Sequence, residues 1–280
     1  MTTQAAAPLL APTGIDLDSP NAQNPDQLAR FRQDGYIKLK DVLTPAKLAH
    51  YGPEITRQVH RLNELHKPMA QRTTYEKAFL QVMNIWTKSP EVKEFSFSRR
   101  LARLAAELMG VRGVRMYHDQ ALYKESGGGV TPWHADQYYW PVATNNTCTV
   151  WVPLQATPKD MGPLAFSVGS HRFAKGRDME ISDDSEKQIS KALLETGLPL
   201  IDEPFDLGEV SYHYGWTFHR AGPNTTGRPR AVMTVIYIED GCLLSQPVNK
   251  NQQADWGTWM PGARVGEVVD SPLNPVLYRA

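Results

Sequence analysis

The second half of the chain is divided into short apolar runs that are rich in β-branched and aromatic residues, with Gly, Pro or Asn between them. Five such runs stand out: RMYHDQALYK (115–124), TCTVWVPLQA (147–156), PLAFSV (163–168), EVSYHYGW (209–216) and RAVMTVIYI (230–238). Runs of this length and composition are typical of strands. Because regular helices do not alternate with them, they predict an antiparallel barrel or a double-sheet jelly roll rather than a parallel sheet.

Helices are predicted before the strands, so the fold class is α+β. The segment DQLARFRQDGYIKLKDVL (26–43) indicates a helix capped by Asp26 and ended by Gly35, followed by a short strand. A second helix is expected after Thr44 and Pro45. A third, over residues 98–109, is expected to pack on the core, because its apolar residues recur at spacings of three and four: Leu101, Leu104, Ala105 and Leu108.

The length and composition predict one domain. The 280 residues are 41% hydrophobic, which is enough for one sizeable core. Residues 1–25 have no apolar periodicity and are predicted to be a flexible lead-in, leaving 26–280 as the domain and about 111–245 as its jelly-roll core. The polar stretch at 182–197 is predicted to be an inserted lid helix, and helices near Met69–Trp86 are a second candidate lid.

Charge and cysteine content exclude several classes of partner. Thirty basic residues balance thirty acidic ones without long runs of either sign, so neither nucleic acid nor a membrane surface is expected as a partner. Cys148 and Cys242 do not form a disulfide framework, and no stretch is apolar enough to span a membrane, so we expect a cytoplasmic protein with a small-molecule substrate. A monomer and a homodimer both remain open.

The strongest local motif is TPWHADQYYW, residues 131–140. His134 and Asp136 are two residues apart, so on an extended backbone both side chains point to the same side and can meet one metal ion. His219, in GWTFHRAGPN, is the best candidate for a third ligand. Two imidazoles and one carboxylate on one face of an ion leave positions open, as in non-haem Fe(II) oxygenases, although catalytic zinc is also chemically possible.

An arginine follows the last candidate ligand by eleven residues. Arg230 opens the apolar strand 230–238, where a buried guanidinium needs an anion and suits a carboxylate. A dicarboxylate that chelates the metal at one end and meets Arg230 at the other would satisfy both. Arg228 has the same parity, but it precedes Pro229 in a turn and is expected to be exposed.

At these residues the sequence resembles the phytanoyl-CoA dioxygenase family of Fe(II)- and 2-oxoglutarate-dependent oxygenases. The resemblance rests on four motifs in order: FRQDGYIKLKDVL, TPWHADQYYW, MGPLAFSVGSHRF and WTFHRAGPN with RPRAVMTVIY. It implies a double-stranded β-helix core, with N-terminal helices packed on its outside. It also implies that Fe(II), 2-oxoglutarate and O2 are used to attack an unactivated C–H bond, by hydroxylation or by a related desaturation, epimerisation or cyclisation.

The resemblance also assigns residues. His134, Asp136 and His219 match the iron ligands, and Arg230 matches the residue that pairs with the C5 carboxylate of 2-oxoglutarate. Lys124 lies where some relatives have a second contact to the co-substrate, although it can also be read as a surface cation. Gln120 shares its strand parity with Lys124, so it is expected to line the co-substrate or the substrate side.

Aromatic residues near the motifs predict a fairly apolar substrate pocket, lined by Trp133, Tyr138, Trp140, Trp151 and Trp216. His171 is not expected to bind the metal, since a fourth protein ligand would block an open position. His118 and His213 are interpreted as structural, that is, as pocket-wall or hydrogen-bonding groups rather than ligands. Since no basic cluster suits the phosphates of coenzyme A, a small or medium organic molecule from secondary metabolism or catabolism is expected instead.

Two rival hypotheses remain at this level. In the first, a cupin-like enzyme has the same metal but binds its substrate directly and does not use 2-oxoglutarate. In the second, the jelly roll is a non-catalytic binding protein with a vestigial triad. In the first, Arg230 needs another anion, and the second must explain why all three ligands are retained.

Overall fold

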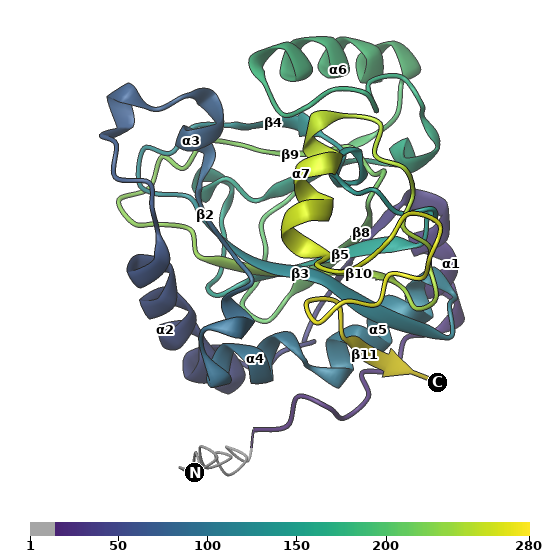
Figure 1. The fold of residues 1–280 in the computed structure, drawn as a ribbon. Helices are drawn as coiled ribbons and strands as arrows, with labels where there is room; N and C mark the ends of the chain where they lie inside the picture. The colour runs from purple at the N-terminus through teal and green to yellow at the C-terminus, as the bar shows by residue number, and fades with distance from the viewer. Residues whose placement is uncertain (1–14) are drawn as a thin grey trace, which may run out of the picture.

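The computed structural model describes residues 15–280, which form two antiparallel sheets with helices around them (Figure 1). The larger sheet has seven strands, in the order β1 (Tyr36–Leu39), β8 (Val210–Tyr214), β5 (Thr147–Pro153), β10 (Val232–Glu239), β3 (Gly113–Tyr123) and β11 (Val276–Arg279), with β2 (Leu80–Met83) also paired to β3. The smaller sheet has four strands, in the order β4 (Thr131–His134), β9 (His219–Ala221), β6 (Leu164–Ser167) and β7 (Leu200–Asp202).

The five predicted strand runs are confirmed as β3, β5, β6, β8 and β10. β10 lies in the middle of the larger sheet, where Met233 pairs with Ala121 of β3 on one side and with Val152 of β5 on the other. All but the last residue of β10 are buried, which explains why its sequence is a continuous apolar run rather than an alternating one.

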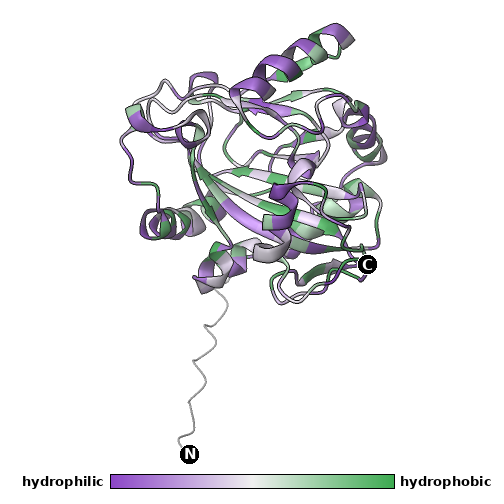
Figure 2. Cartoon of the chain, turned by 45° about the horizontal axis from the view of Figure 1, so that its top comes forward, coloured by the Kyte–Doolittle hydropathy of each residue, from purple (hydrophilic) through white to green (hydrophobic). Residues whose placement is uncertain are grey.

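Most of the helices precede the long strands in sequence, and four of them pack on the outer face of the larger sheet. The helices are α1 (Pro25–Asp34), α2 (Pro45–Leu62), α3 (Thr74–Ala78), α4 (Pro90–Ser96), α5 (Arg99–Met109), α6 (Asp183–Thr196) and α7 (Lys250–Trp259). The largest apolar cluster joins α1, α2, α4 and α5 to this sheet, and it includes the whole predicted stripe of α5. In Figure 2 much of the green colour follows the strands in the middle of the molecule, whereas the surrounding helices carry much purple.

Of two predictions about the N-terminal helices, one is wrong and one is confirmed only in part. The N-cap of α1 is Asn24, not Asp26, because Pro25 takes the first helical position and the Asn24 side chain accepts a 2.8 Å bond from the backbone N–H of Gln27. The predicted helices near Met69–Trp86 are two single 3-10 turns, the five-residue α3 and the strand β2, whose alternating apolar residues add to the edge of β3. The helix at 182–197 is confirmed as α6, capped by Ser182 and ended by Gly197.

Residues 1–14 of the predicted lead-in lie outside the described residues, but its remainder contacts the domain. Leu17 is buried, and its carbonyl oxygen accepts a bond from Ser98 at the start of α5. Arg100 donates to the carbonyl oxygen of Ser19 and pairs with Asp16. The segment from residue 15 therefore lies along the N-terminal end of α5.

Candidate metal centre

His134, Asp136 and His219 come together where two neighbouring strands of the smaller sheet meet. His134 ends β4, His219 begins β9, and the two residues are paired in the register. Ala135 is extended, so Asp136, at the start of a 3-10 turn (Asp136–Tyr139), points back toward the two imidazoles. The candidate ligand atoms of all three lie within 4.8 Å of one another, so one ion can reach them all.

Backbone carbonyls orient both imidazoles. Nδ1 of His134 lies 2.7 Å from the carbonyl oxygen of Pro132, and Nδ1 of His219 lies 2.9 Å from that of Thr217. Because a carbonyl can only accept, Nδ1 carries the proton in each ring and Nε2 has a free lone pair. Each Nε2 lies 3.6 Å from Oδ1 of Asp136, around the position that an ion would take.

The other oxygen of Asp136 is held by the larger sheet. Oδ2 accepts a 3.0 Å bond from Thr149 of β5 and lies 3.3 Å from Nε2 of His213 of β8. Thr149 and His213 are opposite each other in the β5–β8 register, so one strand pair supplies both contacts. Burial alone would raise the pKa of Asp136, but His219, His134 and His213 outweigh it and hold that pKa well below its usual value. The carboxylate is therefore charged.

This donor set fits a divalent metal with open positions. Two neutral imidazole nitrogens and one carboxylate oxygen are the ligands of facial Fe(II) sites, and burial lowers the pKa of His219, which keeps that ring neutral. Both cysteines are buried and free, and neither belongs to the cluster. His171 is also remote from the cluster: its ring stacks on Tyr214, with ring centres 5.4 Å apart.

Two buried cations lie side by side at another wall of the site. Lys124 and Arg230 are paired across an antiparallel bridge, and both are almost fully buried. Nη1 of Arg230 donates to the carbonyl oxygen of Gly162, while its Nε has no partner. Lys124 donates to the carbonyl oxygen of Gly129 and, at 3.3 Å, to the hydroxyl of Thr131.

These two cations have no carboxylate partner among the ion pairs of the described residues. Burial lowers the pKa of Arg230 to about 9, and burial together with Arg230 lowers that of Lys124 to about 6. At neutral pH Arg230 is therefore charged and Lys124 is largely neutral. A buried charge is normally paired, so Arg230, with Lys124 beside it, forms an incomplete anion site. Arg228, by contrast, is exposed, as predicted.

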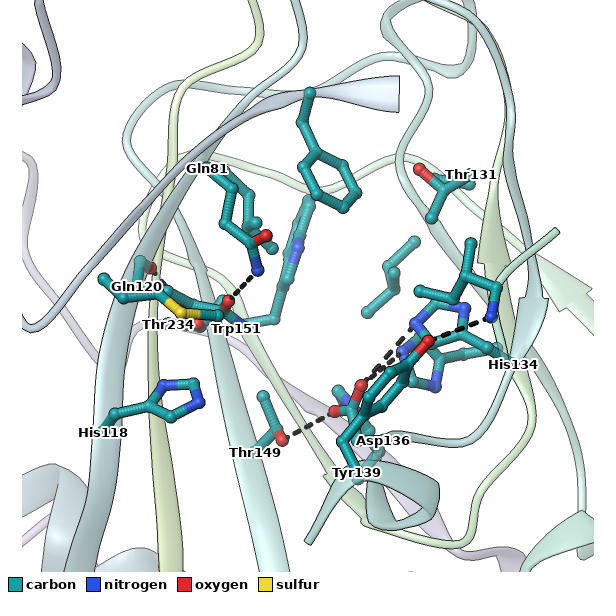
Figure 3. A pocket seen from close by; sticks show the side chains of 18 of the residues that line it. Gln81, His118, Gln120, Thr131, His134, Asp136, Tyr139, Thr149, Trp151 and Thr234 are labelled. Atoms are coloured by element: carbon teal, nitrogen blue, oxygen red, sulfur yellow. Dashed lines mark hydrogen bonds and ion pairs between the residues drawn. The ribbon is translucent and has the colours of Figure 1, made fainter. Parts of the chain in front are cut away.

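One cavity, partly open to solvent, connects the candidate metal centre to Arg230. Figure 3 shows His134 and Asp136 on one side of it, with Gln81, Gln120 and His118 on the opposite side. Gln120 accepts a 2.6 Å bond from the amide of Gln81, and it lines the cavity as its parity predicted.

Only part of the predicted aromatic lining reaches this cavity. Trp140 and Trp151 line it, and the Arg230 guanidinium lies 5.3 Å from the centre of a Trp151 ring. Trp133 instead packs with residues of α6, and Trp216 lines a separate cavity beside His171. Tyr138 does not line the cavity either, since its hydroxyl accepts a bond from Asn251 of α7.

Several lining residues were missed from sequence. Tyr75 and Phe79 come from α3 and its end, Gln81 and Met83 from β2, Ile181 from the segment before α6 and Asp255 from α7. His118 and His213 were interpreted as pocket-wall or hydrogen-bonding groups rather than ligands, and both line the cavity.

Comparisons with known proteins agree with this geometry. The family model described as phytanoyl-CoA dioxygenase (PhyH) matches residues 31–232, which is most of the chain. The chain belongs to the PhyH family. This membership covers all four site residues derived above, His134, Asp136, His219 and Arg230.

Relatives of this PhyH-family chain include two curated bacterial proteins. It is 21% identical, over 76% of this chain and 77% of the relative, to a probable alpha-ketoglutarate-dependent hypophosphite dioxygenase of Stutzerimonas stutzeri. It is 25% identical, over 75% and 79%, to a methylphosphonate hydroxylase of Gimesia maris.

Among solved structures, the epimerase SnoN from nogalamycin biosynthesis, in complex with Fe3+, alpha ketoglutarate and nogalamycin RO, aligns with a TM-score of 0.74. The identity is 23%, over 90% of this chain and 98% of SnoN. At this identity the likeness shows a shared fold. No helix in the part of the chain that the structure describes is long and apolar enough to cross a membrane.

Proposed function

We propose that the protein is an Fe(II)- and 2-oxoglutarate-dependent oxygenase that acts on an unactivated C–H bond of a small or medium organic molecule. The observation that carries the proposal is that one cavity holds an open-faced triad and a buried arginine without an anionic partner, with Lys124 beside that arginine. A cupin-like enzyme without 2-oxoglutarate, or a vestigial binding protein, would leave Arg230 and Lys124 buried without a purpose.

His134, Asp136 and His219 would hold the iron, and Arg230 would pair with the C5 carboxylate of 2-oxoglutarate. Lys124 would support this contact from behind Arg230, because its Nζ bonds to Thr131, a lining residue. Bound iron and 2-oxoglutarate would supply, with O2, an oxidant able to remove hydrogen from the substrate, with succinate and carbon dioxide as by-products.

The chain's own part is to orient and to exclude water. Thr149 and His213 fix Oδ2 of Asp136, so that Oδ1 faces the ion. Trp140, Trp151 and Gln120 would form the substrate wall, and the apolar part of this lining keeps water from the reacting carbon.

We further propose that residues 26–280 are a single oxygenase domain with a double-stranded β-helix core at about 111–245. Support comes from the two antiparallel sheets, whose facing sides enclose the cavity. α6 is the proposed lid helix. Ile181, just before it, lines the cavity, and its N–H donates to the Tyr139 hydroxyl.

Anaerobic titration of the Fe(II)-loaded protein with 2-oxoglutarate tests this function. Chelation should give a weak visible charge-transfer band, and admission of O2 should release succinate. Arg230→Ala should weaken 2-oxoglutarate binding by about 100-fold, since a buried charge-assisted contact is worth about 3 kcal/mol. The matched control is Arg228→Ala, which removes an exposed arginine two residues away and should change nothing. If the protein gives no band, or if both variants behave alike, the co-substrate assignment is wrong.

A further inference from the structure

A second charged group lines the same cavity and has no partner of opposite charge. Asp255, on α7, lines the cavity, and it appears in none of the ion pairs of the described residues. Its Oδ2 accepts a 2.8 Å bond from the hydroxyl of Tyr117, and the side chain of Trp259 is a second donor. Burial raises the pKa of Asp255 to about 6, but these two donors favour its charged form, so it is largely ionised at neutral pH.

Asp255 and the candidate metal ligand Asp136 both affect the pKa of one lining residue, Tyr75. Asp136 and Asp255 each contribute to raising the pKa of the Tyr75 hydroxyl, after the larger effect of burial. Tyr75, from α3, is therefore within electrostatic reach of both carboxylates. Asp255 thus belongs to the wall that faces the metal, rather than to an unrelated surface.

A histidine with an unpaired ring nitrogen contacts the two residues that donate to Asp255. His118 is 3% exposed, lines the cavity, and its Nδ1 has no hydrogen-bond partner. Its ring lies 5.0 Å from that of Tyr117 and 5.6 Å from that of Trp259, the two residues that donate to Asp255. Burial lowers the pKa of His118 to about 4, so the ring is neutral and is not the missing cation.

Aromatic rings complete this part of the cavity. Trp140 and Tyr139 line it, and the Trp140 ring lies 5.3 Å from that of Tyr117. A buried carboxylate beside aromatic faces is the chemistry that recognises ammonium groups. Arg230 is the one Lys or Arg side chain that the described residues contribute to the lining, and its role is already assigned to the co-substrate.

We propose that the substrate carries a cationic nitrogen, an amine or a quaternary ammonium, which binds between Asp255, His118 and the rings of Tyr139 and Trp140. This inference rests on the proposed function, since it names the substrate class of the same site. It also separates this chain from the two curated relatives, because hypophosphite and methylphosphonate are anions. An anion on this wall would face the Asp255 carboxylate without a second cation to hold it.

The test compares ammonium compounds with neutral compounds of the same size and with an anion. Choline is paired with 3,3-dimethylbutan-1-ol, 2-(dimethylamino)ethanol with 3-methylbutan-1-ol, and cyclohexylamine with cyclohexanol, while methylphosphonate serves as the anion. Binding to the full-length protein is measured anaerobically by calorimetry and tryptophan fluorescence. Each titration is done with Mn(II) and 2-oxoglutarate present, and again with neither.

We expect at least one ammonium compound to bind about tenfold more tightly than its neutral partner, which corresponds to about 1.4 kcal/mol. Asp255→Asn should reduce this ratio to within about twofold. The exposed Asp26→Asn, a matched change on α1, should leave it intact. If Asp255→Asn fails to fold, Tyr117→Phe serves instead: it removes one donor to the carboxylate and should lower the ratio.

The proposal is overturned if no ammonium compound outbinds its partner, if methylphosphonate binds best, or if the preference survives Asp255→Asn. A failure of the proposed function is distinguishable from these results. It would appear as a missing charge-transfer band with 2-oxoglutarate, whereas the ammonium preference would still be present in the protein without metal or co-substrate.

Discussion

Replacing Lys124 by Met should stabilise the protein while weakening its binding of 2-oxoglutarate. Met has a similar length without the charge, and the position is fully buried beside Arg230. The pKa of Lys124 in the folded protein is about 6, against 10.5 for an ordinary lysine. Between these values the unfolded chain binds more protons than the folded one, so the wild-type protein gains stability as the pH rises from about 6 to about 10.5.

The magnitude follows from the same shift. Each pH unit of the shift corresponds to about 1.4 kcal/mol. The buried lysine therefore lowers the free energy of unfolding by about 6 kcal/mol near pH 6, by about 4 kcal/mol at pH 7.5 and by almost nothing above pH 10. Met removes this cost but also loses two hydrogen bonds, to Gly129 and Thr131, worth about 1 kcal/mol each. The variant should therefore be more stable than the wild type by about 4 kcal/mol at pH 6 and about 2 kcal/mol at pH 7.5, and less stable near pH 10.

Urea unfolding of the metal-free protein at several pH values, followed by circular dichroism, measures this difference. Lys191→Met, on the exposed side of α6, is the control and should show no pH-dependent difference from the wild type. Calorimetry of the iron-loaded protein should show weaker 2-oxoglutarate binding in Lys124→Met. A variant that is less stable than the wild type at pH 6, or a stability difference that does not change with pH, would refute the reasoning.

Three further outcomes are expected. His134→Ala and Asp136→Ala should abolish succinate release but leave the circular dichroism spectrum unchanged. The reason is that an open-faced site contributes less to folding than a closed structural one. Unfolding of these variants would instead indicate a structural metal. His213→Phe should lower Fe(II) affinity by about 10- to 100-fold, because the change removes the His213 contact to Oδ2 of Asp136. Competition with a chelator measures the affinity, and an unchanged value would contradict the positioning role of His213. Burial raises the pKa of Asp119 to about 7, so the wild-type protein should lose stability as the pH rises from about 4 to about 7. Asp119→Asn should remove this dependence in urea unfolding, and a stability difference between the two proteins that does not change with pH would contradict it.

The candidate metal cluster could be predicted because each of its residues belongs to a short local pattern. The spacing of His134 and Asp136 on an extended backbone places them on one side, and His219 and Arg230 share one motif with fixed spacing. The strands β3, β5, β6, β8 and β10 were also predictable, since their apolar runs are separated by turn residues. The family resemblance added the order of the motifs, which a single spacing does not provide.

The substrate wall was not predictable in the same way. α7 is polar, contains Gly257 and has no apolar periodicity, so nothing in its sequence indicates a helix or places Asp255 near the metal. The run that became β2 is only four residues long, and whether such a run joins a sheet or a helix is decided by tertiary contacts with β3. Of the predicted aromatic lining, Trp133, Tyr138 and Trp216 lie elsewhere because residue type alone does not indicate which side of the backbone faces the cavity.

The pairing of His134 with His219 across β4 and β9 has a consequence for the smaller sheet itself. A slip of one residue between these strands would turn one imidazole to the opposite face, so a bound ion locks the two strands in their native alignment. Amide protons in these two strands should accordingly exchange with deuterium faster once a chelator has removed the metal. In this sheet, the catalytic ion would also hold β4 and β9 in their native register.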